Sequence, residues 1–219
     1  MTTLEIADEK ALSDLAAFTS LAHRLDTDGA MRLQVASEVL VLTVAPLFPH
    51  GIGDSTPLVL AMRMQRLDSP ELDGLDEVVP LAALTDRFAR AENGTSLPLP
   101  PTSMLVSWAG IAPPRGPWEQ TDTIAPSALI AGAEAGIAEV ADGTPDGAGS
   151  HAVKALRARV WAAPLTGDHG TTLTAGLAFA AAGLRFLPPS ANAACPIMES
   201  AGWLRVVTPG GHLLTRKTA

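Results

Sequence analysis

Hydrophobic residues recur at helical spacing near the start of the chain. Between residues 8 and 25 the apolar positions fall on one helical face, and they are Leu12, Leu15, Ala16, Phe18, Ala22 and Leu25. Acidic residues at the beginning of this segment suit the positive end of a helix dipole. The pattern predicts a helix over 8–25.

Three strand-like segments follow this helix. Apolar and polar residues alternate from Met31 to Val35, β-branched residues dominate 39–44, and alternation returns in 58–67. In the last segment Leu58, Leu60, Met62 and Met64 are expected on one face, with Arg63 and Gln65 on the other. These segments predict an antiparallel three-stranded meander.

The middle of the chain changes character. A short helix is expected over 80–91, and Asn93-Gly94-Thr95 is expected to be a turn. Proline and glycine are then so frequent over 97–120 that regular structure is not expected there. We place a boundary here and predict two parts, 1–122 and 123–219, with a single domain as the alternative.

The second half alternates between helical and strand-like patterns. Helices are expected over 126–141, 150–164 and 171–186, the last one capped by Thr171 or Thr172, with a flexible loop over 142–150. The small residues Ala128, Gly132 and Gly136 share a stripe that favours close packing. Pro-Gly-Gly at 209–211 joins two β-rich runs into a C-terminal hairpin. The predicted fold class is α+β, with an antiparallel sheet that this hairpin can join.

Composition restricts the class of protein. The chain has 219 residues, of which 47% are hydrophobic and 17% charged, enough for a sizeable core. We find no secretory signal pattern and no apolar run of the ~20 residues that a membrane span needs. Cys195 is the single cysteine, so no internal disulfide is expected. These features favour a cytoplasmic protein.

Charge is unevenly distributed along the sequence. Residues 1–147 carry 8 Lys/Arg and 21 Asp/Glu, whereas residues 148–219 carry 7 and 2. An acidic body disfavours nonspecific nucleic-acid binding, but the basic C-terminal part could form a local cationic face.

Catalytic and metal-binding motifs are weak. Gly53-Asp54-Ser55-Thr56 is similar to the nucleophile block of GDSL esterases, but that family's Asp-x-x-His near the C-terminus has no counterpart here, since Asp168 and His169 are adjacent. A hydrolase using Ser55 is therefore only an alternative. Dinucleotide and phosphate-loop motifs are absent from the sequence, and the five histidines have no metal-ligand spacing. We expect no cofactor and no metal.

A tryptophan-rich loop at 107–120 is the leading binding candidate. Trp108 and Trp118 offer a large apolar area, and Arg115 offers a guanidinium fork to a carboxylate, a phosphate or a protein partner. The competing interpretation is that the tryptophans hold the loop against the core, with Arg115 stacked on a ring or paired with Glu119. If the loop is a contact surface, the function is protein binding or self-association, including a homodimer.

A second binding candidate is the basic C-terminal segment. Three helices followed by a hairpin are similar in order to a winged helix, a DNA-binding fold. The residues that could contact nucleic acid are Lys154, Arg157, Arg159, Arg205 and Arg216. The expected third helix, however, has a single charged residue and little that could contact a base edge. Nucleic-acid binding is therefore the less favoured alternative.

Finally, the sequence resembles a known group of proteins. The Trp-x-Gly-x-x-Pro-Pro-Arg loop at 108–115 and the Gly-Trp-Leu-Arg start of the C-terminal hairpin at 202–205 are similar to a family of uncharacterised actinobacterial proteins. The high ratio of arginine to lysine, 12 to 3, fits a GC-rich genome. The resemblance implies origin and shared architecture, and it assigns no activity.

Overall fold

The computed structural model describes residues 2–90, 94–144, 147 and 149–217. The chain divides into two compact units, which we describe separately. Unit 1 comprises Met1–Pro46 and Met62–Ile111, and unit 2 comprises Leu47–Ala61 and Ala112–Ala219. The division into 1–122 and 123–219 that the sequence favours stays a prediction.

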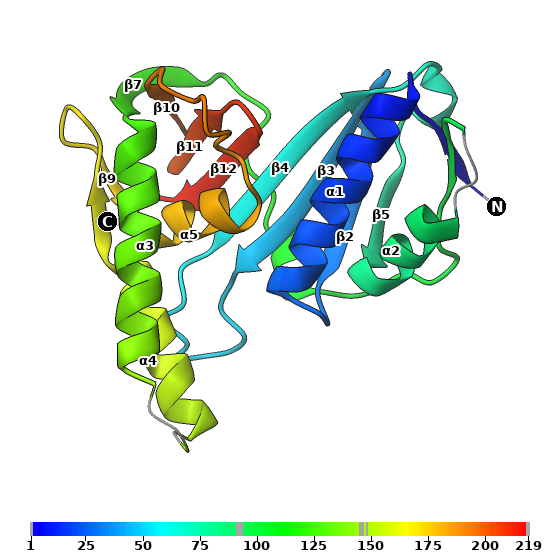
Figure 1. Cartoon of the computed structure of the whole chain (residues 1–219). Helices are drawn as coiled ribbons and strands as arrows, with labels where there is room; N and C mark the ends of the chain where they lie inside the picture. Colours follow the sequence, from blue (N-terminus) through cyan, green and yellow to red (C-terminus); the bar gives the residue numbers. More distant parts are fainter. Residues whose placement is uncertain (1, 91–93, 145–146, 148, 218–219) are drawn as a thin grey trace. The chain divides into compact units, whose positions relative to one another are not determined.

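Runs of strands are separated by helices along the chain (Figure 1). The helices are α1 (Glu9–Leu25), α2 (Leu81–Arg90), α3 (Pro126–Asp142), α4 (Ser150–Ala162) and α5 (Ala175–Gly183), with 3-10 turns η1 (Pro70–Leu72) and η2 (Ser107–Gly110). The strands are β1 (Thr3–Glu5), β2 (Ala30–Ala36), β3 (Val39–Leu47), β4 (Val59–Arg66), β5 (Asp76–Pro80), β6 (Ser96–Pro98), β7 (Glu119–Ile124), β8 (Pro164–Thr166), β9 (Thr172–Thr174), β10 (Cys195–Ser200), β11 (Trp203–Thr208) and β12 (Gly211–Arg216).

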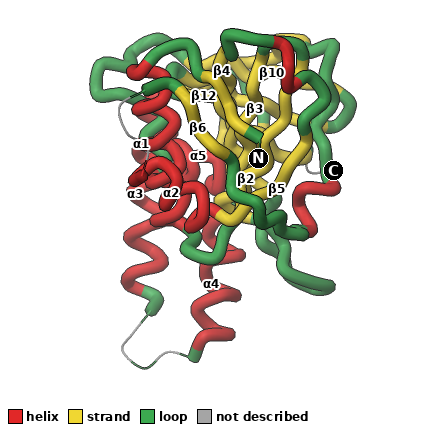
Figure 2. The backbone as a smooth tube through the Cα atoms, turned by 90° about the vertical axis from the view of Figure 1, so that its right-hand side faces the viewer, coloured by secondary structure: helices red, strands yellow, loops and turns green. Residues whose placement is uncertain are grey.

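Unit 1 packs two helices on the predicted meander. Asp8 caps α1 by accepting a hydrogen bond from the backbone N–H of Ala11 at 2.7 Å. In this unit α1 and α2 lie on one side of the strands (Figure 2), and Leu15, Phe18 and Leu33 are among the residues buried there. β2 pairs with β3 and with β5, both antiparallel.

One side of β4 departs from its expected pattern. Arg63 lies 5.5 Å from the centre of the Phe18 ring, so a charged residue occupies the helix-covered side. Met64, expected on the apolar face, is 52% exposed. The meander is confirmed, but the expected apolar face holds only at the start of β4, where Leu60 and the preceding Leu58 are buried.

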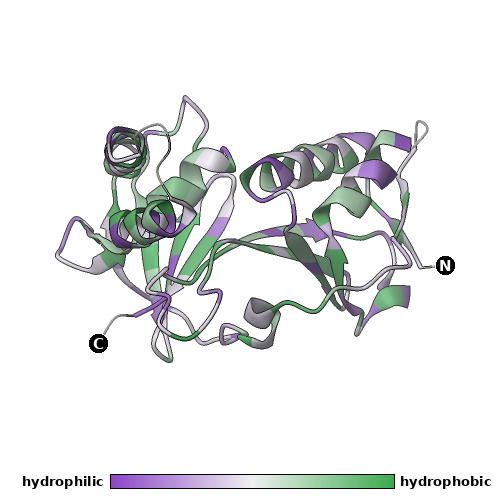
Figure 3. Ribbon diagram, turned by 90° about the horizontal axis from the view of Figure 1, so that it is seen from below, coloured by the Kyte–Doolittle hydropathy of each residue, from purple (hydrophilic) through white to green (hydrophobic). Residues whose placement is uncertain are grey.

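Unit 2 packs three helices on strands from its C-terminal end. β10, β11 and β12 pair consecutively, and β7 forms the outer strand beside β10. Helices lie to one side of the strands in this unit (Figure 3). The predicted C-terminal hairpin is confirmed by β11 and β12, and the strand order within unit 2 is β12-β11-β10-β7. The α+β fold class is therefore confirmed.

The small-residue stripe of α3 makes a close approach, as expected. A Cβ added at Gly136 would lie 2.7 Å from Cη2 of Trp161. Trp161 comes from α4 and is 2% exposed. The stripe thus admits the indole ring at Gly136, and at Gly132 it lies close to Ala178 of α5.

The structure corrects one helix prediction in the second half of the chain and confirms that the segment 97–120 has little regular structure. The third C-terminal helix is shorter than predicted: Thr172–Thr174 form β9, which pairs with β8, and Thr174 caps α5. The segment 97–120 is mostly irregular, as predicted. Three predictions fall partly outside the described residues. They are the turn at 93–95 (at Asn93), the end of the 80–91 helix (at Ala91) and the loop at 142–150 (at residues 145, 146 and 148).

Candidate functional site

Trp118, predicted as part of a protein-binding loop, and Arg205, predicted as a nucleic-acid contact, lie against each other in unit 2. Trp118 precedes β7, and Arg205 lies in the middle of β11. The guanidinium carbon of Arg205 lies 4.3 Å from the centre of the Trp118 ring, within cation–π range. This stacked pair is the centre of the candidate site.

The strand register shows which residues share a face with Arg205. Arg205 pairs with Met198 on β10 and with Leu214 on β12, and directly paired residues project to the same side. Two positions along β12 from Leu214 are His212 and Arg216, and Arg216 lies 4.7 Å from the ring centre of Trp203. We call this side of the strands the Arg205 face. Its exposed or half-buried residues are Trp118, Gln120, Met198, Arg205, His212 and Arg216, whereas Trp203 and Leu214 on the same side are buried.

The described residues do not neutralise the charge of Arg205. Among the described residues no carboxylate lies within 4.0 Å of its guanidinium. Its Nε is buried and has no hydrogen-bond partner among them. Burial lowers the pKa of Arg205, and burial together with the Arg205 charge lowers the pKa of His212. Burial thus disfavours the charged form of both groups, and the positive charge of Arg205 further disfavours protonation of His212.

Glu119, next to Trp118, and Glu199, the acidic residue closest to Arg205 in sequence, do not offset the charge of Arg205. Glu119 pairs with Glu199 across the β7–β10 ladder, and Glu199 pairs with Leu204 on β11. Side-chain alternation places them on the opposite side of the sheet from Arg205. Glu199 is instead paired with Lys217 at 2.7 Å.

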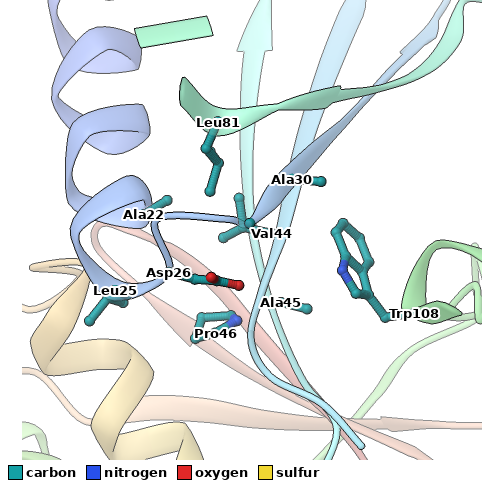
Figure 4. A pocket seen from close by; sticks show the side chains of 10 residues that line it. Ala22, Leu25, Asp26, Ala30, Val44, Ala45, Pro46, Leu81 and Trp108 are labelled. Atoms are coloured by element: carbon teal, nitrogen blue, oxygen red, sulfur yellow. The ribbon is translucent and has the colours of Figure 1, made fainter. Parts of the chain in front are cut away.

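Trp108 occupies a different environment, in unit 1. It is 3% exposed and lines a cavity of about 10 Å³, with room for about one water molecule. The remaining lining residues are mostly apolar, with Asp26 among them (Figure 4). The backbone carbonyl of Ala109 accepts a hydrogen bond from Arg32. Trp108 therefore anchors the start of the loop in a core and presents no indole surface to a partner.

Neither Arg115 nor the basic residues of α4 take part in the Trp118–Arg205 contact. Arg115 is exposed, and among the described residues it makes no ion pair with Glu119. Lys154 and Arg157 lie on α4, and Arg159 pairs with Glu139 of α3 at 2.9 Å. Of the five predicted nucleic-acid contacts, the register brings Arg205 and Arg216 together on one face.

Ser55 lies in a loop that its neighbour Asp54 closes. Asp54 accepts backbone hydrogen bonds from His50 and Thr56, which lower its pKa to about 2. Within the described part of the chain no hydrogen bond joins Ser55 to a histidine. The local geometry is that of a capped turn.

His169 is held by a different acid. Its Nδ1 lies 2.8 Å from Oδ1 of Asp122, whose side chain is fully buried, whereas the His169 side chain is 75% exposed. Burial alone would raise the pKa of Asp122, but hydrogen bonds from the Thr171 and Thr123 backbone and from His169 lower it below its usual value. The contact orients the 167–171 loop.

Neither a metal-ligand cluster nor a membrane-spanning helix occurs among the described residues. These residues contain no group of three or more His, Cys, Asp or Glu side chains arranged to hold a metal ion. None of the helices in the described ranges is long and apolar enough to cross a bilayer.

Sequence families divide the chain near residue 111. Residues 1–110 match the model described as Domain of unknown function (DUF8010). The chain belongs to the DUF8010 family. Residues 113–219 match a second model, Domain of unknown function (DUF8185), which contains the whole Arg205 face. No curated protein matches the chain.

Solved structures similar to the chain include bacterial DNA polymerase sliding clamps. The clamp of Pseudomonas aeruginosa is 14% identical, with a TM-score of 0.49, and the match covers 99% of this chain and 63% of that one. For the Bacillus subtilis clamp the values are 12%, 0.47, 100% and 64%. The chain thus spans less than two thirds of the length of these proteins, and identity this low does not indicate a shared function.

Sequence reasoning found Trp118 and Arg205 separately but did not pair them. They are 87 positions apart along the chain, and β10 lies between their strands in the sheet. The role of His212 on the same face was also missed. The alternation within 203–208 and 211–216 could have placed Arg205 and His212 on one side, but the β10–β7 pairing that brings Trp118 there has no signal in the sequence.

Proposed function

We propose that this chain is a non-enzymatic binding protein whose contact surface is the Arg205 face, and that its partner is another protein. The observation that carries the proposal is the Arg205–Trp118 stack, in which a half-buried guanidinium lacks a counter-charge in the described chain. Tryptophan and arginine are among the residues most enriched at the positions that dominate binding energy at protein interfaces.

A protein partner suits this surface better than nucleic acid does. A protein that neutralises several phosphates needs several cations along one groove, and the Arg205 face has two arginines. The half-buried side chains of Trp118 and Met198 add apolar area beside Arg205. Unit 2 carries 8 Lys/Arg and 9 Asp/Glu in all, so it has no overall positive charge to attract a polyanion.

Site-specific photo-crosslinking in the native cell tests the proposal. A photoreactive amino acid at Gln120, which is exposed on the Arg205 face, should give one discrete adduct that mass spectrometry identifies as another protein. The same group at Ala155, exposed on α4, is the matched control and should give none. An adduct at both positions, or at neither, would refute the proposal, and an adduct with a second copy of the chain would replace the partner by self-association.

A further inference from the structure

We infer that Arg205 and Trp118 form a receptor for a carboxylate group in an acidic segment of the partner protein. This inference rests on the proposed binding function and adds the chemistry of the ligand. Its starting point is the Arg205 guanidinium, which has no anion among the described residues: its Nε is buried without a hydrogen-bond partner, and its two Nη atoms are not sealed from solvent.

Buried polar groups in folded proteins are normally paired, because an unpaired donor loses its hydration without compensation. Arg205 is an exception in this chain. Arg32, by comparison, is held by both carboxylate oxygens of Asp76 at 2.7 Å and by the carbonyl of Ala109. The fold therefore satisfies the guanidinium of Arg32 and leaves that of Arg205 without an anion among the described residues.

Trp118 fixes how a ligand can approach. The indole lies against one side of the guanidinium, with 4.3 Å between the ring centre and the guanidinium carbon. A ligand therefore has to approach from another side, and the edge that bears the Nη atoms is open to it. The two Nη atoms make no hydrogen bond to the described residues, and neither is sealed from solvent. A carboxylate matches the planar fork of this edge with two parallel N–H···O bonds.

The surroundings favour a carboxylate on a peptide. Met198, which is half-buried, flanks Arg205 directly on β10 and provides apolar contact for the methylene groups of a glutamate or for its neighbours. Arg216, stacked on Trp203, adds a second cation diagonal to Arg205. The acids nearest in sequence lie on the other side of the sheet, so they do not repel an acidic segment from this face.

The test uses the full chain and defined small probes. Blocked glutamate, blocked glutamine, acetate and inorganic phosphate are titrated at constant ionic strength while NMR follows the Arg205 Nε–H and Trp118 indole N–H signals. Blocked glutamate and acetate should give saturable shifts, with blocked glutamine at least about tenfold weaker because it lacks the charge of the acceptor. Equal shifts with glutamate and glutamine would overturn the inference, as would tighter binding of phosphate than of carboxylate.

Variants separate this result from a general loss of structure. Arg205→Gln should abolish the shift of the Trp118 signal, Arg205→Lys should weaken it, and Arg115→Gln, an exposed arginine outside the stack, should leave it unchanged. Unfolding temperatures of all three check the fold. A shift that persists in Arg205→Gln refutes the carboxylate receptor. Crosslinking at Gln120 without any carboxylate selectivity would refute this inference and leave the proposed function standing.

Discussion

Replacing Gly136 by alanine should destabilise unit 2 even though alanine favours helices. The added Cβ would lie 2.7 Å from Cη2 and 3.1 Å from Cε3 of Trp161, and this indole is buried against Phe179 with ring centres 4.6 Å apart. Overpacking of this kind costs about 1–3 kcal/mol, while exchanging glycine for alanine within a helix returns about 1 kcal/mol. We expect a net loss of up to about 2 kcal/mol.

Gly132 of the same helix is the matched control. A Cβ there meets Cδ1 of Leu165 at 3.3 Å, the far end of a flexible side chain, so Gly132→Ala should leave stability unchanged or raise it. Urea unfolding followed by circular dichroism measures both variants, and a loss of about 1 kcal/mol corresponds to a melting temperature about 2–4 °C lower.

A second substitution identifies the cause. Trp161→Phe removes the ring carbons that the new methyl group would meet, so Gly136→Ala should cost less in that background than in the original chain. It also removes the indole N–H, which has no hydrogen-bond partner among the described residues. Equal effects of Gly136→Ala and Gly132→Ala, or an unchanged cost beside Trp161→Phe, would refute this account of α3 and α4 packing.

Substitutions in other parts of the chain give three further predictions. Asp122→Asn should cost about 1–3 kcal/mol of unfolding free energy at pH 7, because an amide cannot accept every hydrogen bond that the carboxylate accepts. Since the pKa of Asp122 is lowered in the folded chain, the stabilisation that its carboxylate provides is present above pH ~4 and is lost as the pH falls further. The unfolding curves of the original chain and of Asp122→Asn should therefore converge in acid. Gly210→Ala should destabilise more than Gly136→Ala does, because the new Cβ would lie 2.5 Å from the backbone Cα of Phe186, and a normal melting temperature would contradict this. Trp108→Ala should cost about 3–5 kcal/mol in urea unfolding, whereas Arg115→Ala, which is exposed, should change stability by less than about 0.5 kcal/mol.

The sequence predicted local elements where periodicity is strong. The spacing of apolar residues located α1 and the meander, and Pro-Gly-Gly located the C-terminal hairpin, because these signals lie within a short window. β9 was mistaken for the start of a helix because Thr172 and Thr174 serve equally well as caps and as strand residues. Here the pairing with Pro164–Thr166 decided the outcome.

Long-range pairing accounts for what the sequence did not reveal. Charge counted along the chain gave a basic C-terminal part, but the acids of β7 and α3 belong to the same unit and cancel that excess. The loop at 107–120 looked like one feature, yet Trp108 belongs to unit 1 and Trp118 to unit 2. Strand register, which depends on residues far apart, determines which side chains of unit 2 share a face.

One measurement decides whether the Arg205 face is the contact surface. The partner identified by crosslinking is purified, and its affinity is measured for the original chain, for Arg205→Gln and for Arg115→Gln. Arg205→Gln should weaken binding at least about tenfold, as expected when a charge-assisted contact is lost, while Arg115→Gln should bind as the original chain does. Equal affinities for the original chain and Arg205→Gln would contradict the assignment of the Arg205 face as the contact surface.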